Sequence, residues 1–116
     1  MEKPGMSKSS TTIDDLGTID RVTTSPGEML REEFLEPLGL SANALALALR
    51  VPANRVTAVL KNERAVTADT AMRLGRYFGT SARFWLNLQQ SYDLSRARKT
   101  LAAKIDREVS PREIAA

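Results

Sequence analysis

The chain has 116 residues, enough for one modest hydrophobic core but not for two. It contains no cysteine and no histidine, which excludes disulfides, thiolate chemistry, most zinc sites and the usual general base, and no cofactor is expected. No apolar run approaches membrane-spanning length, and the first residues lack the apolar segment of a signal peptide. A cytoplasmic protein without membrane contact is therefore expected.

The charge is unevenly distributed along the chain. Lys and Arg number 17 against 14 Asp and Glu, a formal net charge of +3. Between residues 41 and 83, however, basic residues outnumber acidic ones by seven to two. Such an excess fits a surface that binds a polyanion, although a solvated face can carry the same charges, so it indicates nucleic acid only beside a motif. The residues concerned are Arg50, Arg55, Lys61, Arg64, Arg73, Arg76 and Arg83, with Glu63 and Asp69 as the acids.

Residues 1–24 are predicted to form a disordered arm. Ser, Thr and Gly are frequent there and aliphatic residues are scattered, so folding would bury too little apolar surface to offset the entropy of ordering. Ile13, Leu16 and Ile19 could form a small apolar face against a partner; alternatively, the arm could remain solvated or the chain could start at Met6.

An ordered domain is predicted over residues 25–96, and its first helix begins with the capping box Ser25-Pro26-Gly27-Glu28. The helix is predicted to end near Glu36, because Pro37 restricts the residue before it and Gly39 follows. Apolar residues recur along it at helical spacing and should face the core. They are Met29, Leu30, Phe34 and Leu38.

The stretch Ser41–Arg64 predicts two short helices joined by a tight turn, a helix-turn-helix. Ser41 caps the first helix, whereas Pro52 interrupts the pattern and suits the start of the second. Small Ala46 lies where the two helices must approach each other. The apolar positions 45, 49, 51, 56 and 59 match the packing that holds paired helices at a steep angle.

The outward face of the second helix of this pair carries the functional prediction. Asn can bond an adenine edge, Thr a base or a thymine methyl, and Arg or Lys guanine or phosphate. We predict base contacts near the N-terminus of the helix and phosphate contacts after its end. Arg55 could instead point back toward a phosphate, and Asn54 could be an ordinary first-turn polar residue. The predicted DNA-binding residues are Asn54, Arg55, Thr57, Lys61, Asn62 and Arg64.

Two further helices are predicted, the first capped by Thr67 and ended by Gly79, the second opened by Ser81. Trp85 lies on an apolar stripe and is predicted to fill the core rather than to stack on a base. Residues 97–116 are predicted to form a helical extension or a tail, because their apolar strip is thin and would need a second subunit or a partner. The inward residues of the two helices are Ala71, Met72, Leu74, Phe78, Phe84, Trp85, Leu88 and Tyr92.

From Ser25 to Leu94 the chain resembles the HigA/VapI-type antitoxins, a branch of the Xre/Cro-like helix-turn-helix regulators. The stretches SPGEMLREEFLEPLGLSANALA and VPANRVTAVLKNERAVTADTAMRLGRYFGTSARFWLNLQQSYDL carry the resemblance. The helix-turn-helix spacing is common to all Xre-like proteins, whereas TADTAMRLGRYFGTSARFWLNLQQSYDL is more particular to this branch.

The resemblance implies an all-α, five-helix, lambda-repressor-like domain that forms a homodimer, with Pro52–Leu60 as its recognition helix. It implies a repressor that binds double-stranded operator DNA of its own operon. It also implies an antitoxin that neutralises a HigB-type toxin, a ribosome-dependent mRNA endonuclease. No enzymatic activity of the chain itself is expected. The alternatives are a stand-alone Xre-family regulator, or a toxin-binding module that no longer reads DNA.

Two positions depart from the family pattern. Arg50 occupies the turn position where such motifs usually carry glycine, and a left-handed Arg50 would cost on the order of 1 kcal/mol. Glu63 replaces the glycine of the common Asn-Gly pair after the recognition helix. Its carboxylate conflicts with a close phosphate, so contacts by Asn62 and Arg64 are the least supported of those predicted.

Overall fold

The computed structural model describes residues 22–113, and within this range all regular structure is helical. The first helix runs without a break through α1 (Pro26–Leu30), η2 (Arg31–Leu35) and α2 (Glu36–Leu38). The next four helices are α3 (Ala42–Leu49), α4 (Ala53–Leu60), α5 (Ala68–Phe78) and α6 (Ala82–Glu108). The all-α, five-helix prediction is confirmed. The predicted arm, with its three apolar residues, lies outside the described residues apart from its last three positions.

The chain divides into two compact units. The unit Thr23–Leu94 holds α1 to α5 and the first half of α6, and the hydrophobic core lies within it. The other unit includes Ser95–Ala116, where Leu101, Ile105 and Val109 are exposed. Across the described part of the chain, no helix is both long enough and apolar enough to cross a bilayer.

The helix starts follow the capping residues that the sequence predicts. In each case the side-chain oxygen accepts a hydrogen bond from the backbone N–H three residues later, at 3.0 to 3.4 Å. These bonds satisfy donors that the first turn of a helix leaves without an intrahelical partner. The four capping residues are Ser25, Ser41, Thr67 and Ser81.

The prediction that the first helix ends near Glu36 is wrong, since the helix continues through Pro37 to Leu38. The π-helical turn η2 precedes the proline, and the Glu36 N–H donates to the carbonyl of Arg31, five residues back. This wider turn relieves the clash that a proline ring makes with the preceding turn of a regular α-helix. The extra residue rotates the rest of the helix by about 100°. Leu35 is therefore buried, and Leu38, predicted to face the core, is 63% exposed.

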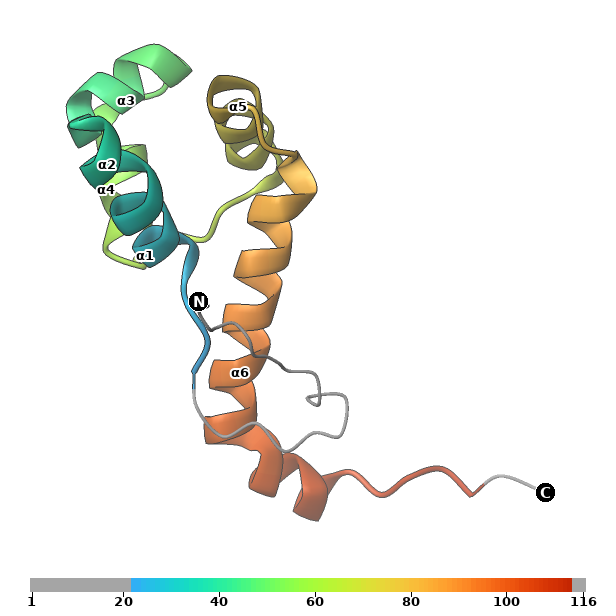
Figure 1. Ribbon diagram of the computed structural model, residues 1–116. Helices are drawn as coiled ribbons and strands as arrows, with labels where there is room; N and C mark the ends of the chain where they lie inside the picture. The colour runs from blue at the N-terminus through green and yellow to red at the C-terminus, as the bar shows by residue number, and fades with distance from the viewer. Residues whose placement is uncertain (1–21, 114–116) are drawn as a thin grey trace, which may run out of the picture. The chain divides into compact units, whose positions relative to one another are not determined.

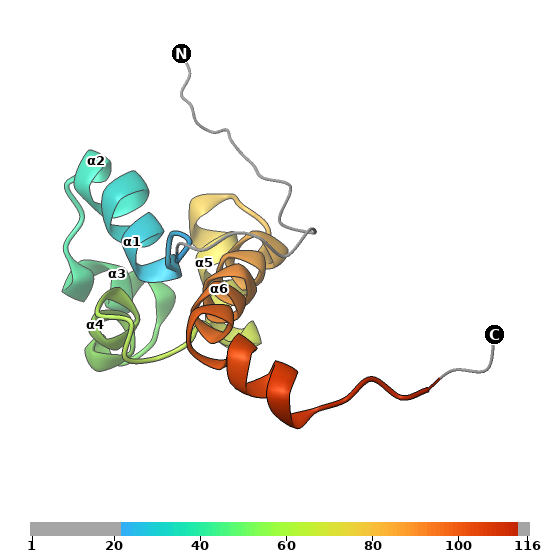
Figure 2. The same cartoon turned by 90° about the horizontal axis from the view of Figure 1, so that it is seen from below.

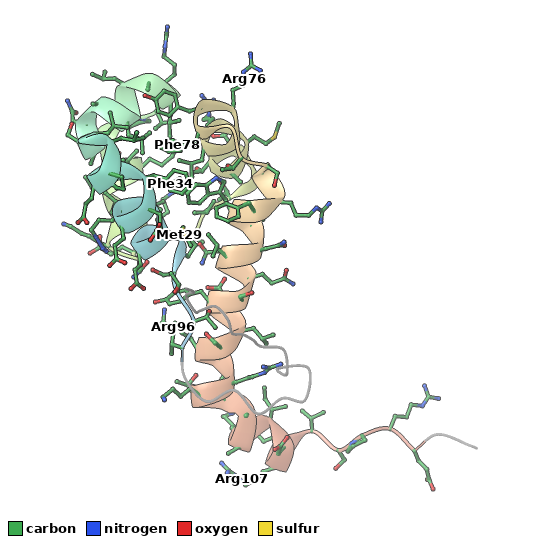
Figure 3. The ribbon with its side chains drawn as sticks, in the orientation of Figure 1. Met29, Phe34, Arg76, Phe78, Arg96 and Arg107 are labelled. Atoms are coloured by element: carbon green, nitrogen blue, oxygen red, sulfur yellow. The ribbon has the colours of Figure 1, made fainter. Side chains whose placement is uncertain are left out.

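The centre of the core is aromatic. Trp85 is 0% exposed, as predicted, and its Nε1 donates a hydrogen bond to Thr80 Oγ1 at 2.8 Å. The ring centroid of Phe34 lies 5.1 Å from that of Trp85 and 4.7 Å from that of Phe78. Figure 3 shows Phe34 and Phe78 pointing toward each other. This cluster joins the first helix to α5 and α6.

One residue of α5 that is predicted to point inward lies on the exposed side of the helix. Ala71 and Leu74 are buried and Phe78 packs against the core, but Met72, also predicted to point inward, is 66% exposed. Met72 follows Ala71 directly, so it is rotated by about 100° from the line of residues that faces the core.

Within the unit Thr23–Leu94, both helices of the helix-turn-helix pair contact a further helix: α4 contacts α1, and α3 contacts α5. In Figure 1, α1 to α4 form one group and α5 lies beside them, and in Figure 2 α4 is seen next to α3 and α1. The approach of α1 to α4 requires Gly27, because a Cβ there would collide with the Val59 carbonyl oxygen and lie 2.9 Å from that of Leu60. Helix α1 therefore fixes the C-terminal end of α4.

Candidate nucleic-acid interface

Helices α3 and α4 pack through their apolar inner faces, as predicted from the spacing. We call these residues the inner face of the pair. Each is less than a tenth exposed, so the two helices contribute these faces to the hydrophobic core. The inner face consists of Leu45, Ala46, Leu49, Val56 and Val59.

The turn between the two helices is built around Arg50, which is left-handed with φ 61° and ψ 44°. The Arg50 N–H donates to the Leu47 carbonyl at 3.2 Å, and the Val51 N–H donates to the Ala46 carbonyl at 3.1 Å. These are the two bonds of a Schellman motif, and they satisfy carbonyls at the end of α3. They offset a strain on the order of 1 kcal/mol that an L-residue incurs in this region. The turn therefore keeps its geometry without glycine.

A second Schellman motif ends α4, and its left-handed residue is Asn62, with φ 60°. The Asn62 N–H donates to the Val59 carbonyl at 3.0 Å, and the Glu63 N–H donates to the Ala58 carbonyl at 2.8 Å. Asparagine tolerates this conformation better than most other side chains do. Glu63 is not among the left-handed residues of the described chain, so its backbone does not require the glycine that it replaces.

Asn54 and Thr57 are exposed near the N-terminus of α4. This helix begins at Ala53 with Pro52 as its N-cap, one residue later than predicted. Thr57 Oγ1 donates to the Asn54 carbonyl at 3.3 Å. The side-chain amide of Asn54 makes no hydrogen bond within residues 22–113, so its donor and its acceptor are both available to a ligand.

Three predicted residues follow the helix. Lys61 and Arg64 are exposed, and neither forms an ion pair in the part of the chain that the structure describes. Asn62 is exposed as well, but its side-chain oxygen lies against α1, where a Cβ on Gly27 would be 2.9 Å from Asn62 Oδ1. Lys61 and Arg64 thus leave their positive charges accessible to a ligand, while the side-chain oxygen of Asn62 faces α1.

Arg55 is placed differently from the other predicted residues. It is half-buried, and its Nη1 donates to Asp69 Oδ2 at 2.6 Å. The same oxygen accepts from Arg73 Nε at 3.0 Å, and Arg73 Nη1 donates to the Leu49 carbonyl at 2.8 Å. We call Arg55, Asp69 and Arg73 the α5 clasp, because they connect α5 to both helices of the pair.

The clasp keeps its carboxylate charged. The hydrogen bond from Arg73, and then that from Arg55, lowers the pKa of Asp69 from its ordinary value. Both bonds favour the ionised form, so Asp69 is an anion at neutral pH.

Asp69 and Arg73 belong to the charged stretch of residues 41–83, but neither is among the predicted DNA-binding residues. Their spacing of four residues within α5 is a signal for an ion pair between them. The bond from Arg55 to Asp69, however, spans 14 residues of sequence and depends on how α4 packs beside α5. No local pattern indicates it.

The chain matches a known protein family and is similar in sequence to known proteins. A family model described as a helix-turn-helix matches residues 31–85. Virulence-associated protein I of Dichelobacter nodosus is 55% identical over 74 residues, which are 64% of this chain and 68% of that protein.

Two solved structures are also similar to the chain. An addiction module antidote protein of a HigA family from Coxiella burnetii is 49% identical, with a TM-score of 0.74 over 79% of this chain and 100% of that one. The structure of Pseudomonas aeruginosa antitoxin HigA with the higBA promoter is 46% identical, with a TM-score of 0.73 over 76% of this chain and 96% of that one.

Proposed function

Because the chain belongs to the HigA family of helix-turn-helix antitoxins, we propose that it is a sequence-specific repressor of its own operon. We also propose that it binds and neutralises a toxin encoded beside it, a HigB-type, ribosome-dependent mRNA endonuclease. In this account the chain itself carries out no chemical reaction.

The observation that carries the DNA-binding part of the proposal is the outer face of α4. Asn54 and Thr57 are exposed, small and polar, and they lie where a recognition helix enters the major groove. The free amide of Asn54 suits an adenine edge, and Thr57 suits a base or a thymine methyl. The similarity to the Pseudomonas aeruginosa HigA that was solved with its promoter supports this role.

The basic residues around α4 supply the contacts to the DNA backbone. Lys61 and Arg64, exposed after the helix, would contact phosphates and make binding sensitive to salt. Asn62 lies in the same segment, and since its side-chain oxygen lies against α1, we assign the phosphate contact to its Nδ2. Arg55 joins them through the donors that its bond to Asp69 leaves unused.

We propose that two copies bind together. A homodimer would place its two α4 helices in successive major grooves, about 34 Å apart, on a palindromic operator. A mobility-shift assay with the DNA upstream of its own gene, at physiological salt, tests sequence-specific binding. The expected result is a shifted band that unlabelled upstream DNA competes away and an unrelated duplex does not. Equal competition by these two duplexes would reject sequence-specific repression.

The antitoxin role is tested through the neighbouring gene. A short basic open reading frame directly beside this one should encode a protein that co-purifies with the chain when the two are expressed together. Expression of that protein alone should arrest growth, and co-expression should restore it. Growth arrest that this chain does not relieve would reject neutralisation.

One observation favours a second function, a toxin-binding module that does not read DNA. Glu63 places an exposed carboxylate in the segment after α4, between Asn62 and Arg64, where it opposes the approach of a phosphate. Under that function, the neighbouring protein is bound and neutralised, but the upstream DNA is not shifted at physiological salt. The two assays together therefore distinguish the functions.

A further inference from the structure

An exposed acidic residue, Asp69, forms an ion pair with Arg55, one of the basic residues that we assign to DNA binding. Asp69 is one of two acids between residues 41 and 83, and its side chain is 54% exposed. Electrostatics alone predicts that a carboxylate beside DNA weakens binding, so that removing the charge would strengthen it. The geometry of the clasp favours the opposite result.

The guanidinium of Arg55 has more donors than the domain uses. It carries five N–H donors in a rigid plane, and within residues 22–113 the bond it makes is the one from Nη1 to Asp69. The side chain is 24% exposed, so part of it is accessible from solvent. An arginine held at one nitrogen offers its remaining donors in a defined orientation.

The carboxylate that holds Arg55 is itself held. Arg73 Nε bonds the same Oδ2 at 3.0 Å, and Arg73 Nη1 is anchored on the carbonyl of Leu49 at 2.8 Å. Through Asp69 and Arg73, the orientation of Arg55 is fixed relative to α5 and to the end of α3. Both of these are packed into the core. A group ordered before binding loses less conformational entropy when it binds.

We propose that Asp69 is a positioning residue for DNA recognition, which holds Arg55 so that its free N–H groups meet an acceptor on the DNA that α4 reads. The acceptor is a phosphate oxygen or the O6/N7 edge of a guanine, since a guanidinium bonds both in the same way. This proposal rests on the proposed repressor function.

The test compares two neutralised acids on two duplexes. Asp69→Asn removes one negative charge and is expected to weaken operator binding about threefold to tenfold, because a charge-assisted hydrogen bond is lost. Glu63→Gln removes one negative charge from an exposed residue with no hydrogen bond or ion pair from its side chain in the described chain, and it is expected to strengthen binding to any duplex. Opposite signs support the proposal.

The comparison is repeated in an Arg55→Ala background to show the route of the effect. There Asp69→Asn should cause no further loss, because the group that it positions is absent. An undiminished loss would assign the effect to Arg73 or to folding and overturn the proposal. The conservative variant Asp69→Glu, which keeps the carboxylate, should retain most of the operator affinity.

Each remaining outcome is decisive. Weakening by Asp69→Asn on operator and random duplexes alike assigns the acceptor to a phosphate, and weakening on the operator alone assigns it to a base. Wild-type protein that binds the operator no more tightly than an Asp69→Asn variant overturns the positioning role and leaves repression intact. Wild-type protein that does not bind its upstream DNA overturns both proposals.

Discussion

The two faces of α4 are made by different rules. On the inner side, Val56 and Val59 are 4% and 3% exposed and pack against α3, whereas Asn54, Thr57 and Lys61 on the outer side are exposed. Apolar burial dominates folding stability, while exposed polar groups contribute little to it. The inner face should therefore determine whether the domain folds, and the outer face what it binds. Substitutions can test this separation.

The largest effect is expected on the inner face of α3. Leu45→Ala removes a fully buried side chain and should lower the free energy of unfolding by about 2 to 5 kcal/mol, measured by urea denaturation. Leu47→Ala on the same helix is the matched control, because Leu47 is 69% exposed, and it should change the stability by less than about 0.5 kcal/mol. Similar losses from both variants would contradict the assignment of faces.

A smaller loss is expected where α1 meets the end of α4. Gly27→Ala forces a Cβ against backbone oxygens that cannot easily move, and it should cost about 1 to 3 kcal/mol of unfolding free energy. Gly39→Ala meets no atom within 4 Å and should show only the left-handed backbone strain, on the order of 1 kcal/mol. A Gly27→Ala domain as stable as wild type would show that α1 does not fix α4.

The smallest effect is the pH dependence of the clasp. Folding lowers the pKa of Asp69, so its contribution to stability is complete above the unfolded pKa and is lost as pH falls through the folded pKa. The difference in thermal midpoint between wild type and Asp69→Asn should therefore stay constant from neutral pH down to about pH 5 and shrink only at lower pH. A difference that varies near neutral pH would contradict an ionised clasp.

Much of the fold can be derived from local signals. The four capping residues, the inner face of the helix pair and the buried Trp85 each depend on a short pattern, and the structure confirms them. The left-handed Arg50 is explained by its place at a helix end where related motifs carry glycine.

The features that the sequence does not predict are the side chains on the wrong face of a helix and the contact between α4 and α5. Leu35 replaces Leu38 in the core because the π turn shifts the phase, and the 3.6-residue repeat carries no sign of that turn. Met72 is predicted to point inward, but it directly follows the buried Ala71 and is therefore exposed. For the candidate interface, single positions on α4 are readable from residue type, whereas the link from Arg55 to Asp69 requires tertiary packing.

The claim that the outer face of α4 reads the operator is tested most directly by measuring two variants on two duplexes across a salt series. Asn54→Ala should weaken operator binding by about 1 to 3 kcal/mol and leave binding to a random duplex nearly unchanged. Lys61→Ala should weaken binding to both duplexes and reduce the salt slope by about one. Equal losses from the two variants on both duplexes would contradict the account.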